Sequence, residues 1–221
     1  MKWSDREIIY CDNHLLVAWK EAGELVQPQL HEEMRLWVQE QFGKPGRAFL
    51  EPVHRLDKPV AGLVLFARTS KALVRLNAAL QKREMGKIYR AWVEGWVLQK
   101  EGELDHFLLH DAFHAKIVPP STPGAKQALL SYKVLERKEQ STLLAIELKT
   151  GRYHQIRAQL SAVGHPILGD HKYGSRSGSG KIALNSTGKI ALDSTGKIAL
   201  EHVKLSFHHP VTGVLLELTK C

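Results

Sequence analysis

Residues 51–69, EPVHRLDKPVAGLVLFART, place a charged run directly before an apolar one. The apolar part, Leu63–Ala67, has the continuous hydrophobic character of a buried strand. The charged part, residues 54–58, holds two cations, a histidine and the carboxylate of Asp57 where the chain enters that strand. Two interpretations are open: Asp57 is half of an ion pair that caps a turn, or it is a reactive group kept ionised by the cations.

The chain continues from this strand into its clearest helical pattern. Thr69 or Ser70 is a suitable N-cap, and leucines recur with helical spacing until Gly86. Three cations fall on the side opposite these leucines: Lys71, Arg75 and Lys82. This basic stripe is either a solvated helix face or a surface for phosphate contacts.

The segment before residue 51 predicts a hairpin and a helix. Ile8–Cys11 and Leu15–Trp19 are short apolar runs separated by polar turn residues, which is typical of a hairpin. Residues 30–42 have helical spacing and a mostly apolar side. That side consists of Leu30, Met34, Leu36, Trp37, Val38 and Phe42.

The second half of the chain is rich in predicted strands. Strands are expected at 88–97, 116–118, 128–135 and 143–148, a helix at 153–163, and a final hairpin at 203–207 and 214–218. Strands and a few helices without regular βαβ alternation predict an α+β fold around a largely antiparallel sheet. We expect one domain over residues 1–221.

Residues 180–200 contain a repeat. Gly-Lys-Ile-Ala-Leu occurs at Gly180, Gly188 and Gly196, with a period of eight residues. This period is too short for a solenoid, so we expect a tandem duplication inserted in a surface loop at about 180–200. Each lysine is followed by isoleucine, which excludes a Walker A phosphate loop.

Composition favours a nucleic-acid partner. The 221 residues include 31 Lys and Arg against 23 Asp and Glu, a net charge of +8, which favours a polyanionic ligand. The sequence holds no signal-like apolar segment or membrane span, so we expect a soluble cytoplasmic protein. Cys11 and Cys221 are far apart, and the histidines lack metal-ligand spacing. We therefore expect no disulfide and no metal.

Two enzyme classes are disfavoured by missing partners of Asp57. There is no Gly-x-Gly-x-x-Gly and no Asp-Phe-Gly, so the His-Arg-Leu-Asp run does not belong to a kinase. A glycosidase needs a pair of carboxylates, and only Glu51 lies near Asp57 in sequence. A lone carboxylate indicates a different reaction.

Three further stretches complete a family pattern: GKIYRAWVEG at 86–95, LKTGRYHQIR at 148–157 and GHPILGD at 164–170. Together with HRLDKPVAGLVLFARTSKA at 54–72, they resemble the RluA-type RNA pseudouridine synthase family over most of the chain. The resemblance implies isomerisation of uridine to pseudouridine in structured rRNA or tRNA. It also implies a mixed, mainly antiparallel central sheet with flanking helices, and no metal or organic cofactor.

The resemblance assigns roles to individual residues. Asp57 matches the catalytic aspartate, and Tyr89 matches the tyrosine that stacks on the flipped base. Arg157 matches the arginine that pairs with the aspartate, and Arg55 matches one that enters the space the base leaves. We expect Arg55, Lys58, Lys71, Arg75, Lys82 and Arg152 to contact RNA. Without the resemblance, Tyr89 would be read as a core aromatic, and Arg152 would compete with Arg157 for the aspartate.

Three departures from the family pattern concern the loop around Asp57. Lys58 stands where arginine is commoner, Ala61 where serine is commoner, and residues 19–23 read WKEAG in place of Asn-Lys-Pro-Ala-Gly. Because only seven residues precede Ile8, we expect no S4-type RNA-binding domain. We expect a monomer that acts on RNA without a membrane or a nucleotide cofactor. The competing hypothesis is a non-catalytic RNA-binding protein on the same fold.

Overall fold

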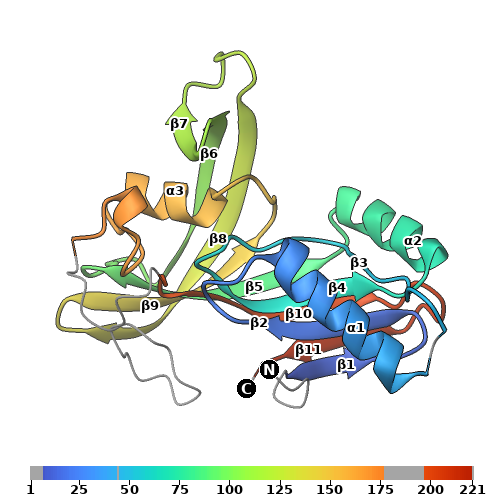
Figure 1. Cartoon of the computed structure of the whole chain (residues 1–221). Coiled ribbons are helices and arrows are strands. Elements are labelled where there is room, and N and C mark those ends of the chain that lie inside the picture. The colour runs from blue at the N-terminus through green and yellow to red at the C-terminus, as the bar shows by residue number, and fades with distance from the viewer. Residues whose placement is uncertain (1–6, 44, 177–196, 221) are drawn as a thin grey trace. The chain divides into compact units, whose positions relative to one another are not determined.

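The computed structural model describes residues 7–43, 45–176 and 197–220, which form two compact units (Figure 1). Unit 1 contains the chain up to Gly86 and the segment from His202 onward, and unit 2 contains Lys87–Glu201. The duplicated segment lies outside the described residues, except for the end of its third copy. The α+β prediction, with a mainly antiparallel sheet and few helices, is confirmed.

Unit 1 is built on strands from both ends of the chain. β2 pairs antiparallel with β1 on one side and with β4 on the other, β4 is followed by β10, and β11 pairs antiparallel with β10. The short strand β3 pairs with β4. Their bounds are β1 (Ile8–Cys11), β2 (Leu15–Lys20), β3 (Glu51–Pro52), β4 (Ala61–Ala67), β10 (Leu200–His208) and β11 (Leu215–Thr219).

Every residue of β2 and β4 is buried, because a helix covers each face of this sheet. Side chains of a strand alternate between the two faces. Those on one face pack with α2 (Ser70–Gln81) through its Ala72 and Leu76. Those on the other face pack with α1 (His31–Gln41) and with the preceding turn η2 (Val26–Leu30). The two layers hold the start of β4 in a fixed place.

The helix boundaries follow local chemistry. The hydroxyl of Thr69 accepts a hydrogen bond from the Ala72 amide at 3.1 Å, so Thr69, one of the two residues expected, is the N-cap of α2.

In α1 the apolar side is narrower than predicted. Met34 and Val38 are buried, whereas Leu36 and Phe42 are about two-fifths exposed because they lie off the buried stripe.

Unit 2 is an antiparallel sheet with strand order β5-β9-β8-β6-β7. Helix α3 (Gln155–Ala162) lies beside β6 and β7 (Figure 1), and the short helix η3 (His171–Tyr173) follows it. The strand bounds are β5 (Gly86–Glu94), β6 (Glu101–Asp111), β7 (His114–Val118), β8 (Lys126–Lys138) and β9 (Ser141–Leu148). β6 was not predicted, because polar residues occupy most of its first half.

The third copy of the repeat ends inside unit 2. Ile198, Ala199 and Leu200 are buried. The carbonyl of Ala199 accepts a hydrogen bond from the Trp92 amide at 3.0 Å, and the Ala199 amide donates to the Leu168 carbonyl at 2.9 Å. At least this copy therefore contributes its apolar residues to the core.

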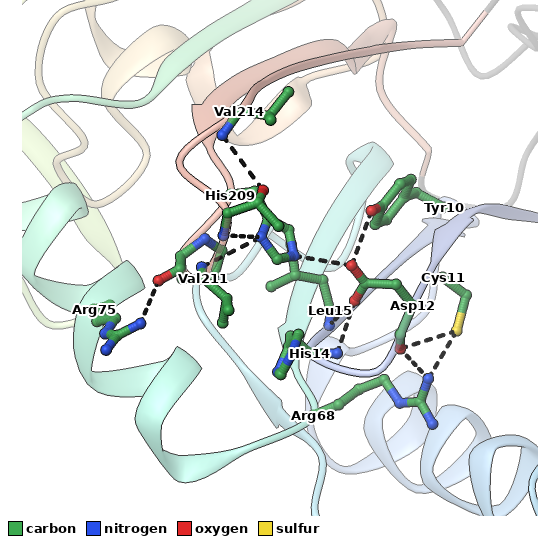
Figure 2. A network of polar contacts seen from close by, with 12 residues as sticks. Tyr10, Cys11, Asp12, His14, Leu15, Arg68, Arg75, His209, Val211 and Val214 are labelled. Carbon is green, nitrogen blue, oxygen red and sulfur yellow. Dashed lines mark hydrogen bonds and ion pairs between the residues drawn. The ribbon is translucent and has the colours of Figure 1, made fainter.

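A polar network centred on Asp12 joins the first and last hairpins of unit 1 (Figure 2). The Asp12 carboxylate accepts hydrogen bonds from two backbone amides of its own turn, at 2.7 and 2.8 Å, and from the Tyr10 hydroxyl at 2.9 Å. Nδ1 of His209 accepts from the Val211 and Thr212 amides, so the ring proton lies on Nε2 and points at Asp12, 2.9 Å away. The network therefore links the turn between β1 and β2 to the turn between β10 and β11.

Candidate active-site residues

Asp57 lies in the loop that enters β4. Val53 and Val60 are buried on either side of it, and the Val60 amide donates to the Asp57 carbonyl at 3.1 Å, which closes a tight turn. Asp57 itself is half-buried, while Arg55 and Lys58 are exposed. The apolar strand thus anchors the loop, and the loop presents a carboxylate flanked by exposed cations.

A buried lysine holds this loop. Lys20, the last residue of β2, is fully buried, and its Nζ donates to the carbonyls of Glu21, Lys58 and Val60 at 2.9, 3.2 and 2.7 Å. The Gly23 amide also donates to the Lys58 carbonyl at 2.7 Å. A buried ammonium is costly unless hydrogen bonds satisfy it, so these contacts strongly favour one loop conformation.

The role of Lys20 was not predicted from the sequence. The stretch WKEAG at 19–23 was noted only as a departure from the family pattern. One feature of the sequence could have indicated this role: Lys20 is a cation at the end of an otherwise apolar strand. Charged residues are rarely buried unless they are paired.

Tyr89 lies on β5 in unit 2, opposite Ile146 of β9. Its side chain is 7% exposed, so most of the ring is covered by protein. This burial is compatible with a core aromatic and with a ring that lines a pocket, and the proposed stacking role stays a prediction.

Arg157 forms a buried bidentate ion pair with Asp170. Nε lies 2.7 Å from Oδ2 and Nη2 lies 2.9 Å from Oδ1, and the side chains are 5% and 1% exposed. The guanidinium also lies 4.9 Å from the centre of the Tyr173 ring. Two parallel hydrogen bonds fix the plane of the guanidinium as well as its position.

This pair changes the account of Arg157. An arginine on an amphipathic helix is usually exposed, but α3 is buried from Gln155 to Leu160. The sequence predicted Asp57 as the partner of Arg157, and that pairing stays a prediction because Asp57 belongs to the other unit. The role of Asp170 was not predicted, although a carboxylate next to glycine at the end of the GHPILGD motif was a usable signal.

The other predicted RNA-contacting cations differ in exposure. Lys71, Arg75 and Lys82 are exposed on α2 and at its C-terminal end, as the basic stripe requires, and Arg75 donates to the Pro210 carbonyl at 2.7 Å. Arg152 is half-buried and its Nε donates to the Gln127 carbonyl at 2.8 Å, so it has at least one structural contact.

Metal ligation and membrane spanning can be judged for the residues that the structure describes. Among them, no group of three or more His, Cys, Asp or Glu side chains is placed to hold a metal ion. Within the same residues, no helix combines the length and the apolar character needed to cross a membrane.

Comparison with known proteins decides the family. The model of the RNA pseudouridylate synthase family matches residues 14–162, which include Asp57, Tyr89 and Arg157. The chain belongs to this family. The resemblance drawn from the sequence motifs to RluA-type pseudouridine synthases is thereby confirmed, and it gives the enzyme class as an isomerase acting on uridine in RNA.

The relatives of this RluA-type synthase support the assignment. The ribosomal large subunit pseudouridine synthase D of Pseudomonas aeruginosa is 35% identical over 215 residues, which cover 96% of this chain and 66% of that protein. The dual-specificity RNA pseudouridine synthase RluA of Pasteurella multocida is 33% identical over 214 residues, which cover 93% of this chain and 88% of the relative.

A solved structure supports the fold of this synthase. The human RNA pseudouridylate synthase domain containing 4 superposes with a TM-score of 0.77 at 24% identity, over 96% of this chain and 87% of the human one. At this identity the similarity concerns the fold alone. It is consistent with the α+β architecture described above.

Proposed function

We propose that this chain converts specific uridines of rRNA or tRNA to pseudouridine, with Asp57 as the catalytic residue. The observation that carries the proposal is the family match over residues 14–162, within which Asp57 occupies the His-Arg-Leu-Asp loop. The names of the two relatives, one acting on the large ribosomal subunit and one of dual specificity, support RNA substrates of this kind.

The reaction is an internal rearrangement of one nucleotide. The bond between N1 of uracil and C1′ of ribose breaks, a bond between C5 and C1′ forms, C5 loses its proton and N1 gains one. The atoms and electrons balance within uridine, so the proposal needs no cofactor or co-reactant. Asp57 must be ionised to act on the ribose or the base, and neighbouring cations favour that form.

Base extrusion is the other requirement of the mechanism. A uridine within structured RNA must leave its stack before its C1′ is accessible, which costs a few kcal/mol. Stacking on Tyr89 would offset part of that cost, and Arg55 would occupy the space that the base leaves. The exposed cations Lys58, Lys71, Arg75 and Lys82 would contact phosphate groups, with Arg152 as a further contact.

We further infer that the enzyme acts as a monomer in the cytoplasm. The unpaired thiol of Cys11 is compatible with a reducing compartment. Sedimentation of the purified protein, with and without RNA, would reveal a dimer if one forms.

The experiment is a map of pseudouridines in cellular RNA with the gene present, deleted and restored. We expect one or more sites to disappear on deletion, to return with the wild-type gene and to stay absent with Asp57→Asn. Glu51→Gln is the matched control, since Glu51 is the acidic residue nearest to Asp57 in this part of the sequence. An unchanged map on deletion would contradict the proposed activity.

A further inference from the structure

A chain of five aromatic rings, joined by four ring contacts, lies in unit 2 next to the β6–β7 hairpin. It runs from β6 through the start of α3 and through η3 to β7, and successive ring centroids lie 4.2, 3.8, 5.5 and 5.6 Å apart. The five rings, in this order, are His110, Tyr153, His154, Tyr173 and His114. The mechanism proposed above does not use them.

The centre of this chain is buried and fixed by hydrogen bonds. The Tyr173 hydroxyl accepts a hydrogen bond from the Ala115 amide at 2.8 Å and forms a second hydrogen bond with Nδ1 of His154, also at 2.8 Å. Burial, with the nearby charges of Arg157 and Lys172, lowers the pKa of His154 to about 3. His154 is therefore a neutral ring in a single orientation at physiological pH.

This fixed centre supports an exposed aromatic ring. Tyr153 stacks on His154 with 3.8 Å between centroids and 19° between planes, although the two residues are neighbours in sequence. The backbone of His154 is left-handed, with φ of +49°, at the point where the two rings stack. This conformation is uncommon for a residue other than glycine. Tyr153 is 41% exposed, so its ring faces solvent on one side while the other side stacks on His154.

The turn of the β6–β7 hairpin presents a second aromatic ring. Asp111 pairs with His114, which leaves Ala112 and Phe113 as a two-residue turn. Such turns favour Asn, Asp and Gly, because the backbone enters the region of positive φ. Here Ala112 has φ of +50°, and the Phe113 side chain is 75% exposed. Core packing does not explain an apolar ring at this place.

Each of these two aromatic rings has a cation near it in space or in sequence. Nζ of Lys172 lies 5.9 Å from the centre of the Phe113 ring, and Lys172 is exposed. Arg152 directly precedes Tyr153 in the chain, and Lys116 of β7 forms an ion pair with Asp111. Exposed aromatic rings with positive charges nearby suit a ligand that offers both flat rings and phosphates. That combination describes unpaired RNA better than an apolar peptide.

We propose that Phe113 and Tyr153 form a stacking platform for unpaired nucleotides of the RNA substrate, with Lys172 and Arg152 contacting the adjacent phosphates. The proposal rests on RNA being the substrate, but it concerns a binding surface that does not include the His-Arg-Leu-Asp loop carrying Asp57. The platform would hold a single-stranded flank of the RNA and so contribute to the choice of target.

The test uses the full chain and a short unstructured RNA that carries a fluorescent adenine analogue, whose emission is quenched when it stacks on an aromatic ring. Phe113→Leu and Tyr153→Leu each remove one aromatic ring. Phe113→Tyr and Tyr153→Phe are the conservative variants, which keep an aromatic ring at the same position. The matched control is Trp96→Leu, which removes another exposed aromatic of unit 2, 56% exposed and hydrogen-bonded to Lys138. Thermal unfolding shows whether each variant is folded.

We expect each leucine variant to bind this RNA roughly fivefold to hundredfold more weakly and to lose quenching, because one stacked base is removed. The tyrosine and phenylalanine variants and Trp96→Leu should bind as the wild type does. Wild-type affinity and quenching in a folded Phe113→Leu variant would overturn the platform while leaving the proposed function intact. Failure of the wild-type chain to bind RNA at all would overturn both.

Discussion

Arg157 and Asp170 form a buried bidentate ion pair within unit 2, with both contacts at 2.9 Å or less. Asp170 is also the N-cap residue directly before η3, and its carbonyl accepts a hydrogen bond from the Ser175 amide at 3.1 Å. The pair thus links α3 to the segment that follows it. A guanidinium held in this way is a fixed positive charge that has already lost its rotational freedom.

Asp170→Asn should strongly destabilise the protein. The substitution leaves the buried Arg157 without its carboxylate, which costs about 3–5 kcal/mol in the free energy of unfolding. Urea unfolding measures the effect. Asp111→Asn is the control, because it breaks a solvent-exposed ion pair with Lys116 and should change the free energy of unfolding little. A loss on Asp170→Asn no larger than that of the control would show that the buried pair has little structural role.

Lys20→Met should lower turnover more than substrate affinity. Without the ammonium, the carbonyls of Lys58 and Val60 lose a donor and the loop carrying Asp57 can shift. We expect kcat to fall about tenfold to hundredfold with KM little changed, as for a misplaced catalytic group. The free energy of unfolding should also fall by about 1–3 kcal/mol.

The control for Lys20 is Lys71→Met on the exposed face of α2, which should leave stability within about 0.5 kcal/mol of the wild type. If Lys20→Met kept the wild-type kcat, the loop would not depend on the lysine for its conformation.

Much of the fold could be predicted from local sequence patterns. Thr69 caps α2 as expected, and the hairpins at both ends of the chain follow apolar runs bounded by turn residues. Strand β6 was missed because Glu101, Glu103 and Asp105 alternate with half-buried residues and give a weak hydrophobic signal. A strand stabilised by its neighbours on both sides does not need a strong pattern of its own.

The site residues were harder to predict than the elements. The motifs predict Asp57, Tyr89 and Arg157 as site residues, but neither Lys20 nor Asp170 could be connected to them by spacing. Lys20 contacts residues about forty positions away, and Asp170 pairs with a residue thirteen positions away across a turn. Such contacts depend on tertiary geometry, which a single sequence does not display.

Asp12 should make stability depend on pH in the acidic range. Burial alone would raise the pKa of its carboxyl, but hydrogen bonds from the backbone amides of His14 and Leu15, and from Tyr10 and His209, lower it below its ordinary value. A depressed pKa in the folded state adds stability above the pKa of the unfolded chain, and this stability is lost as pH falls through the folded pKa.

The test for Asp12 compares Asp12→Asn with the wild type by urea unfolding at several pH values. At pH 7 the variant should lose about 1–3 kcal/mol, because an amide nitrogen cannot accept the bonds (Figure 2). The difference should shrink below about pH 4, where the unfolded carboxyl is protonated. A difference independent of pH would contradict the assignment.

His154 should contribute pH dependence over a higher range. Its pKa is lowered to about 3 by burial and by nearby positive charges, so the folded protein does not take up this proton as pH falls from 6.5, whereas the unfolded chain does. Stability should therefore decline from about pH 6.5 downward by this contribution. His154→Gln should reduce the slope of the free energy of unfolding against pH in this range, by the amount that corresponds to at most one proton. An unchanged slope would show that the imidazole is protonated in the folded protein.

The most direct measurement of the central claim is single-turnover formation of pseudouridine by purified protein on an RNA that contains a mapped target uridine. We expect the wild-type chain to convert the uridine without added metal or cofactor. Asp57→Asn should bind the same RNA with comparable affinity and form no detectable pseudouridine, while Glu51→Gln should retain activity. Conversion by Asp57→Asn at the wild-type rate would contradict the assignment of Asp57 as the catalytic residue.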